Sequence, residues 1–394
     1  MKLYEEIKNL SDKYEEDTAR NLSELIKLKS LSTKEKDVAF AVKSMMEQAN
    51  FDKVWIDGMG NAIGKIGSGN RVIAIDGHID TVDAGQINNW ESNPFGGEIR
   101  DGFVYGRGSV DQKGGVAAFI TSGKIIKELD LARDLTIYFT ATVQEEDCDG
   151  LCWKYIIEED RILPECVIIT EPTDLNIYRG QRGRMEIKID IRGVSSHGSM
   201  PDRGKNAIYM GAEIALKLEK LNAELINDEF LGKGTIALTE FKSSAPSLCA
   251  VSDFVQLHLD RRLTFGEDKD YAVSQVLDLV DKFDADVQVA SYLEKSYTDL
   301  EYGMEKYYPT WKLEENHSLI QKTVLTYKKI FKSEPIIDKW NFSTNGTVIN
   351  GFYNIPAFGF GPGDERLAHA PNEKVPIKHL NYAAAFYSYF CAEY

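Results

Sequence analysis

The chain has 394 residues, of which 43% are hydrophobic and 27% are charged. This length exceeds what one ordinary hydrophobic core accommodates, so we expect two domains. The formal net charge of −16 argues against nucleic acid or an anionic membrane as a partner, because like charges repel.

The compartment can be predicted from the cysteines and the N-terminal segment. No apolar run approaches the length of a transmembrane helix, and the acidic start lacks the features of a signal peptide. Five widely spread cysteines indicate a reducing compartment without a disulfide framework. Cys148 and Cys152 have the spacing of a metal or redox pair, but no second pair completes a zinc site. The sequence therefore predicts a cytoplasmic protein.

The first part of the chain is typical of an α/β domain. Residues 1–50 carry helical periodicity, and short strands are expected at 54–56, 62–66 and 71–75. The third strand is nearly continuously apolar, which is typical of a strand buried on both faces. His78 follows it directly, at the edge of the sheet where α/β proteins bind ligands.

Further candidate ligands also follow predicted strands. Glu145 and Glu146 follow a strand at 135–140, Glu171 follows a strand at 166–169, and His369 follows a strand at 355–360. A helix is expected at 116–129, after the glycine-rich loop 106–115. Because acidic residues without a shared role fall more often on helix faces and solvated loops, this pattern predicts that the ligands converge. Tyr178 and Arg179 are expected on the surface of a hinge.

From about residue 180 the pattern changes to that of an α+β insert. Residues 184–191 alternate polar and apolar side chains, as a half-exposed antiparallel strand does. Helices at 206–221 and 271–283 and strands at 234–238, 254–259 and 287–289 follow. We therefore predict a catalytic domain made of residues 1–179 and 296–394, interrupted by a smaller domain at 180–295.

The candidate ligands are two imidazoles and three carboxylates, a set that suits two divalent ions such as zinc. They are His78, Asp111, Glu146, Glu171 and His369. Asp111 is the candidate bridge, because the surrounding glycines allow the backbone to approach closely. That loop also resembles a phosphate cradle, but no Gly-Lys-Ser/Thr sequence completes a P-loop.

Two further carboxylates, Asp80 and Glu145, are not needed as metal ligands and could have other roles. Asp80 could accept the imidazole N–H of His78 and make its metal-binding nitrogen more basic. Glu145 and Glu146 are adjacent, and one can bind metal while the other takes a proton from water. This combination predicts hydrolysis.

Two residues of the insert have both a structural and a functional interpretation. His197 could be a hydrogen-bonded surface-loop histidine or an oxyanion stabiliser brought onto the site. Arg262 could bind a substrate carboxylate or form a structural ion pair with Asp260. Their positions in the sequence leave both alternatives open.

The motifs together resemble the M20 metallopeptidases, a family of aminoacylases, deacylases and carboxypeptidases. They are Gly-His-Ile-Asp-Thr-Val at 77–82, Gly-Arg-Gly-Ser-Val-Asp-Gln-Lys-Gly-Gly at 106–115, Glu-Glu at 145–146, Glu-Pro-Thr at 171–173 and Ala-His-Ala-Pro-Asn-Glu at 368–373. The resemblance implies an α/β catalytic domain of metallo-exopeptidase type. Its central mixed sheet would be flanked by helices, and the domain would be interrupted by a smaller α+β lid, or dimerisation, domain.

The resemblance also implies residue roles. His78 and Glu171 would bind one metal ion, Glu146 and His369 the other, and Asp111 would bridge them. Asp80 would orient His78, and Glu145 would be the general base. His197 would reach the partner's site in a homodimer formed through the lid, and Arg262 would contact a substrate carboxylate. Asn345 stands where many relatives have aspartate, so no role is transferred to it.

The expected activity is cleavage of the amide bond of an N-acyl or N-carbamoyl amino acid, with Glu145 as general base. Zinc is the first expectation for the two ions, and cobalt and manganese also suit the ligands. The substrate is a small molecule whose free carboxylate would lie near Arg262 or the turn of Gly361 and Gly363. A dipeptidase or carboxypeptidase is the alternative, and a non-catalytic metal-binding protein is the rival from another class.

Overall fold

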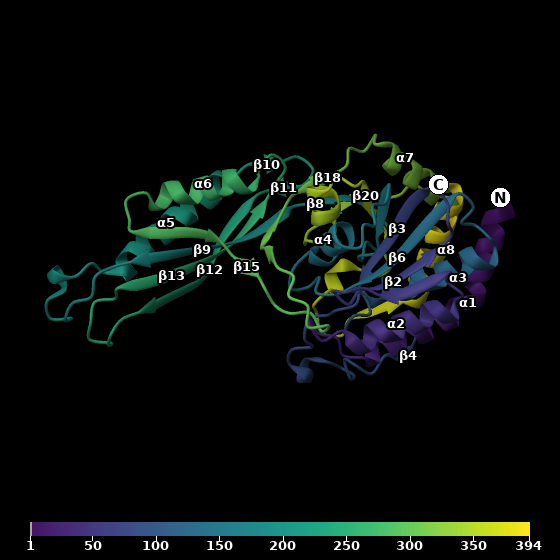
Figure 1. Cartoon of the computed structure of the whole chain (residues 1–394), viewed down its shortest axis with the longest axis horizontal. Helices are drawn as coiled ribbons and strands as arrows, with labels where there is room; N and C mark the ends of the chain where they lie inside the picture. Colours follow the sequence, from purple (N-terminus) through teal and green to yellow (C-terminus); the bar gives the residue numbers. More distant parts are fainter. Residues whose placement is uncertain (1) are drawn as a thin grey trace.

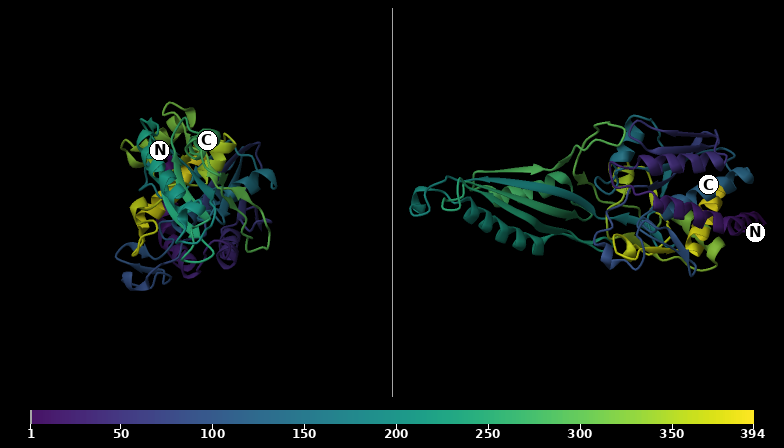
Figure 2. Two further views of the ribbon diagram at one scale, coloured as in Figure 1. Left: turned by 90° about the vertical axis from the view of Figure 1, so that its left-hand side faces the viewer. Right: turned by 90° about the horizontal axis from the view of Figure 1, so that it is seen from below.

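The structure is a computed structural model that describes residues 2–394. Two lobes lie end to end along the long axis, and both chain termini lie on the larger lobe (Figure 1). The views in Figure 2 show the smaller lobe as a narrow extension of the larger one.

A mixed sheet of nine strands forms the centre of the larger lobe, in the order β1-β2-β6-β3-β7-β20-β8-β18, with β19 paired to β8. The pairs β3–β6, β3–β7, β7–β20 and β8–β19 are parallel, and the others are antiparallel. This confirms the expected central mixed sheet. The strands are β1 (Lys53–Ile56), β2 (Ala62–Ile66), β3 (Arg71–His78), β6 (Leu135–Thr142), β7 (Cys166–Ile169), β8 (Ile177–Gln181), β18 (Trp311–Lys312), β19 (Ile337–Trp340) and β20 (Ala357–Gly359).

Amphipathic helices cover this sheet. In α1, Ile7, Tyr14, Leu22 and Ile26 recur on one face and are buried, as a helical period requires. The helices α1, α3 and α8 pack against one another, and α2 packs on β1 and β2. The helices of this lobe are α1 (Lys2–Lys27), α2 (Lys36–Gln48), α3 (Lys113–Glu128), α4 (Leu151–Glu158), α7 (Ser318–Phe331) and α8 (Ile377–Glu393), with a π-helix at Thr347–Phe352.

The smaller lobe, which we call the lid, has a five-stranded sheet with two helices on one face (Figure 1). Inward residues such as Ile187, Ile189, Leu257 and Leu259 alternate with polar ones and form its own core. The elements are β9 (Gly183–Arg192), α5 (Ala207–Glu224), β12 (Thr235–Ser244), β13 (Phe254–Leu263), α6 (Lys269–Val280), β14 (Ala285–Val289) and β17 (Tyr307–Tyr308).

The chain leaves the large sheet between β8 and β9, at Arg182, and re-enters it at β18. Between β14 and β17 it also contacts the larger lobe, where Tyr297 and Tyr302 donate to Gly60 and Glu158. The division into 1–179, 180–295 and 296–394 stays a prediction. The expected surface position of Tyr178 and Arg179 was wrong. Their side chains are buried because β8 lies inside the large sheet, paired with β18, β19 and β20.

Three small sheets complete the fold. They pair β10 (Asn227–Asp228) with β11 (Gly232–Lys233), β15 (Ser291–Tyr292) with β16 (Met304–Glu305), and β5 (Phe103–Tyr105) with both β4 (Glu98–Arg100) and β21 (Lys374–Pro376). Within residues 2–394, no helix combines the length and the apolar character needed to cross a membrane.

Candidate metal centre

The parallel strands β3, β6 and β7 bring three ligand segments to one edge of the large sheet. His78 is the last residue of β3, Glu145 and Glu146 follow β6, and Glu171 follows β7. Because parallel strands end at the same edge, their carboxyl ends meet there. Asp111 and His369 reach the same place from loops.

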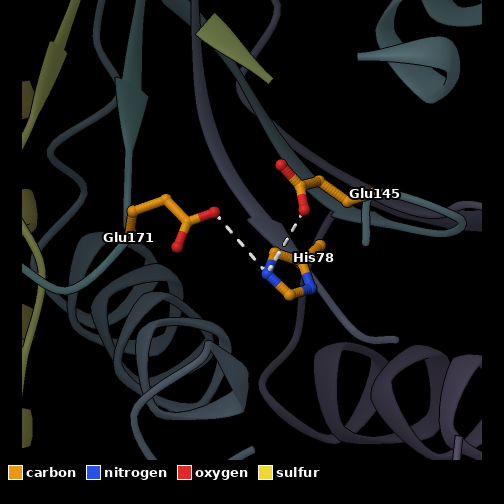
Figure 3. Close-up of side chains that lie close together, drawn as sticks. All are labelled: His78, Glu145 and Glu171. Carbon is orange, nitrogen blue, oxygen red and sulfur yellow. Dashed lines mark ion pairs between the residues drawn. The ribbon is translucent and has the colours of Figure 1, made fainter. Parts of the chain in front are cut away.

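His78 is the centre of the first group of ligands (Figure 3). Its Nε2 lies 2.8 Å from Asp111 Oδ1, 3.5 Å from Glu171 Oε1 and 3.8 Å from Glu145 Oε2. Figure 3 shows Glu145 and Glu171 approaching the same imidazole nitrogen from two sides.

His369 defines the second group. Its Nε2 lies 2.9 Å from Glu146 Oε2 and 3.3 Å from Asp111 Oδ2. Asp111 thus presents one carboxylate oxygen to each histidine, which is the arrangement a bridging ligand needs.

The charges of this cluster are poorly balanced by the protein. Burial raises the pKa of Glu145 and that of Glu171 well above their usual range. Burial and the neighbouring Asp111 raise the pKa of Glu146 to about 7. Hydrogen bonds to Asp111 and Glu146 raise the pKa of His369 to about 10. The raised carboxyl pKa values show that these buried carboxylates lack enough matching cations within the protein, and bound metal ions would supply them.

The residues fit divalent metal ions. Glu145 Oε1 and Glu171 Oε2 are buried without a hydrogen-bond partner in the described chain, so each has a lone pair available. Ligand atoms of His78, Glu145 and Glu171, and again of His78, Asp111 and Glu146, lie within 4.8 Å of one another. Atoms that share a zinc ion at about 2.0–2.2 Å are necessarily this close.

Asp80 contacts both the histidine and the glutamate pair. His78 Nδ1 lies 2.9 Å from the backbone oxygen of Asp80 and 3.5 Å from its carboxylate. The carboxylate accepts hydrogen bonds from the backbone N–H groups of Glu145 and Glu146, at 3.2 and 3.0 Å. Asp80 therefore fixes the loop of the candidate base, in addition to lying beside His78.

The sequence analysis did not single out Glu373, which holds the loop of Asp111. Its carboxylate accepts hydrogen bonds from Arg107 Nη1 and from the backbone N–H groups of Gly108, Val110 and Asp111. Its proximity in sequence to His369 was the available signal.

A cavity of about 350 Å³ opens onto the candidate metal ligands, and Arg262 is among its wall residues. A larger cavity of about 710 Å³ lies between the lobes and has none of the candidate ligands in its walls. The smaller cavity is the relevant one, because it contains the titratable cluster. Its other wall residues, which the sequence analysis did not single out, are Asp149, Arg184, Phe342, Ser343, Glu365 and Ala368.

His197, Gly361 and Gly363 lie neither in the wall of this cavity nor in the candidate ligand cluster within the described part of a single chain. His197 is exposed on the lid, where its Nδ1 lies 2.7 Å from Ser199 Oγ. Gly361 and Gly363 are buried and accept backbone hydrogen bonds from the segment after Glu171. A Cβ at Gly361 would lie 2.1 Å from the backbone oxygen of Glu171, so that glycine allows close packing behind the ligand.

The buried imidazole of His78 and the exposed one of His369 converge with carboxylates at the carboxyl edge of a mixed sheet, an arrangement typical of metal-dependent hydrolases. The model of Peptidase family M20/M25/M40 matches residues 74–393, and the chain belongs to this family.

Relatives of the chain agree with this assignment. The chain is 49% identical over 377 residues to the uncharacterized protein YgeY of Escherichia coli K12, covering 95% of this chain and 94% of that protein. It is 32% identical over 199 residues to a probable succinyl-diaminopimelate desuccinylase of Staphylococcus epidermidis, covering 49% of each.

A solved structure agrees with the fold. The M20 family metallo-carboxypeptidase Sso-CP2 from Sulfolobus solfataricus superposes with a TM-score of 0.73 at 17% identity. The match covers 95% of this chain and 98% of that one.

Proposed function

We propose that the chain is a dinuclear metal hydrolase that cleaves the amide bond of an N-acyl or N-carbamoyl amino acid. The observation that carries this proposal is the position of Glu145. Its carboxylate is buried, one of its oxygens has no partner in the described structure, and the other lies 3.8 Å from His78. A carboxylate held at a metal cluster without a structural partner is suited to proton transfer.

The ligands would divide between two ions. His78 and Glu171 would hold one, Glu146 and His369 the other, and Asp111 would bridge them. When bound, divalent ions polarise a carbonyl group and make water easier to deprotonate. Zinc is the first candidate, and cobalt or manganese also suits nitrogen and carboxylate ligands.

Glu145 would take a proton from the attacking water and later give it to the leaving nitrogen. Asp80 supports this role because its carboxylate fixes the backbone N–H groups of Glu145 and Glu146. Fixing the base reduces the reorganisation that the reaction requires.

The remaining roles concern substrate and partner. Arg262 would bind the free carboxylate of the substrate. A homodimer formed through the lid would bring His197 to the oxyanion of the partner's site. The exposed edge strand β12 and the exposed side chains of Tyr209 and Leu216 on α5 support such a contact. The cytoplasm is the proposed compartment.

A dipeptidase or carboxypeptidase activity is the second candidate. It is supported by the likeness to Sso-CP2, whose title describes a metallo-carboxypeptidase. Both activities use the same ligands and base, so the wall of the cavity decides between them. A non-catalytic metal-binding protein would not need Glu145 beside a complete ligand set.

Amine release from N-acetyl, N-succinyl and N-carbamoyl amino acids and from dipeptides tests the proposal. Stripped protein would be loaded with zinc, cobalt or manganese. We expect Glu145→Gln to lower turnover by about 10²- to 10⁴-fold while metal content is unchanged. Glu159→Gln, a substitution of an exposed carboxylate, is the control. Full activity in Glu145→Gln would contradict the role of this base.

A further inference from the structure

Two arginines face each other at the end of the lid that adjoins the larger lobe. Arg184 of β9 and Arg262 of β13 are direct partners in the antiparallel register. Direct partners share one face of a sheet, with Cβ atoms about 4.5–5.5 Å apart. Like charges in this arrangement are destabilising, so the pair needs a compensating interaction.

Acidic residues provide part of that compensation. Arg262 donates from Nε and Nη2 to Asp260, at 2.7 and 3.1 Å. Arg184 donates from Nη2 to Glu186 at 2.6 Å, and its Nη1 lies 3.4 Å from the buried Asp149. Asp260 and Glu186 are also direct partners, so the acids form a second pair behind the arginines.

The Glu186 carboxylate that partly neutralises Arg184 also interacts with other cationic side chains. Glu186 also accepts from Lys306 Nζ, at 3.1 and 3.2 Å, and lies 3.1 Å from His258 Nε2. One carboxylate thus serves Arg184, Lys306 and His258. An acid shared in this way neutralises each of its partners only in part.

Both arginines retain unused hydrogen-bond donors. The Nε of Arg184 is buried without a partner in the described chain. The Nη1 of Arg262 is not used by Asp260, which takes the opposite edge of the guanidinium. Guanidinium donors match the geometry of a carboxylate.

The cavity that contains the candidate metal ligands is also lined by both arginines. Its wall contains Arg184 and Arg262 together with the candidate ligands Asp111, Glu145, Glu146, Glu171 and His369. Among the wall residues in the described chain, these two are the only lysine or arginine side chains. A substrate whose amide lies at the candidate metal ligands would therefore find a guanidinium contact only at this pair.

We infer that Arg184 and Arg262 together bind the substrate carboxylate, and that Arg184 sets the preference for a free carboxylate over an uncharged end. This inference rests on the proposed function. It adds a specificity-determining residue, Arg184, from the cross-strand partner of Arg262.

The test compares the best N-acyl amino acid substrate with its C-terminal primary amide, using metal-loaded enzyme. We expect Arg184→Gln to lower kcat/KM for the acid by about 10- to 100-fold, chiefly through KM. The kcat/KM for the amide should change by less than about threefold, so the ratio of kcat/KM for the acid to that for the amide should fall. Arg184→Lys, which keeps the charge but not the planar fork, should give an intermediate loss.

Arg192→Gln is the matched control, because Arg192 lies on the same strand and pairs with Asp284 and Asp286. Equal losses for acid and amide in Arg184→Gln would show a structural role and overturn the inference, as would an unchanged acid-to-amide ratio. If Arg184→Gln does not fold, the ratio in Arg184→Lys decides. Wild-type enzyme without turnover on any amide would instead contradict the proposed function, and the inference with it.

Discussion

At the scale of single residues, Glu373 shows how much of the site depends on groups that bind no metal. Its two oxygens accept four hydrogen bonds, two each, from Arg107 and from the backbone of the loop that carries Asp111. Arg107 also donates to the backbone oxygen of His369, at 3.3 Å. The bridging candidate and the second histidine are therefore held by one buried ion pair.

We predict that Glu373→Gln weakens metal binding. The amide would place an NH₂ group against two N–H donors, which leaves buried donors unpaired and releases the Asp111 loop. Loss of such supporting contacts typically costs about 10- to 100-fold in metal affinity or activity. Competition with a metal chelator would measure the affinity. Glu334→Gln, at an exposed glutamate, is the control. Affinity equal to that of wild type would show that the loop holds its shape without this carboxylate.

At the scale of elements, the turn between β1 and β2 brings Asp57 beside Asp160, and this pair of carboxyl groups lies outside the candidate ligand cluster. Asp57 accepts from the backbone N–H groups of Gly60 and Asn61 and so closes the turn. Asp160, just after α4, interacts with Asp57, and its Oδ2 is buried without a partner in the described residues. Burial and the charge of Asp57 raise the pKa of Asp160 to about 7.

This pair predicts a dependence of stability on pH. The unfolded pKa of aspartate is about 3.9, so the folded state holds the Asp160 proton more tightly. The contribution of this proton to the free energy of unfolding is fully present below the unfolded pKa and is lost as the pH rises towards 7. Asp160→Asn removes this titration. The free energy of unfolding of this variant should exceed that of wild type by roughly 1 kcal/mol at pH 8, allowing for solvent screening of a half-buried group. The difference should be smaller at pH 5.

Urea midpoints at pH 5 and pH 8, with metal saturating, would measure the effect. Asp278→Asn on the exposed face of α6 is the control. A gain of the same size at both pH values would show that the charge of Asp160 is not its cause.

The sequence predicted the elements best where the local pattern decides the structure. The apolar run of β3 can only be buried on both faces, and it places His78 at the sheet edge. Glu171 and the Glu145–Glu146 pair follow from the same argument for β7 and β6. Their convergence could be predicted because parallel neighbouring strands end together.

Features that depend on register or on distant partners could not be predicted in this way. The opposition of Arg184 and Arg262 requires the register between β9 and β13, which joins residues far apart in the chain. The burial of Tyr178 and Arg179 depends on strands contributed by residues after 310. Glu373 accepts hydrogen bonds from backbone N–H groups. Nearly every residue type has such a group, so the sequence of the loop does not reveal these contacts.

At the scale of the whole molecule, the two lobes separate residues that are expected to act together. The strand β9 begins at Gly183, beside the larger lobe, and has ten residues. At about 3.3 Å per residue it spans roughly 30 Å, and His197 follows its far end. Figure 1 shows this strand running out along the lid. In one chain, His197 is therefore remote from Glu145, and a catalytic role requires a second copy.

Mixed dimers would show whether two copies share a site. We predict that His197→Ala lowers turnover by about 10²- to 10³-fold, as loss of an oxyanion donor does. A heterodimer of His197→Ala with Glu145→Gln contains one site with both groups intact, if each lid serves the partner. Its turnover should return to about half that of wild type, since one site of two is complete. If each lid serves its own chain, every site lacks one group. Two affinity tags would isolate the heterodimer, and activity no higher than that of the two variants alone would contradict the shared site.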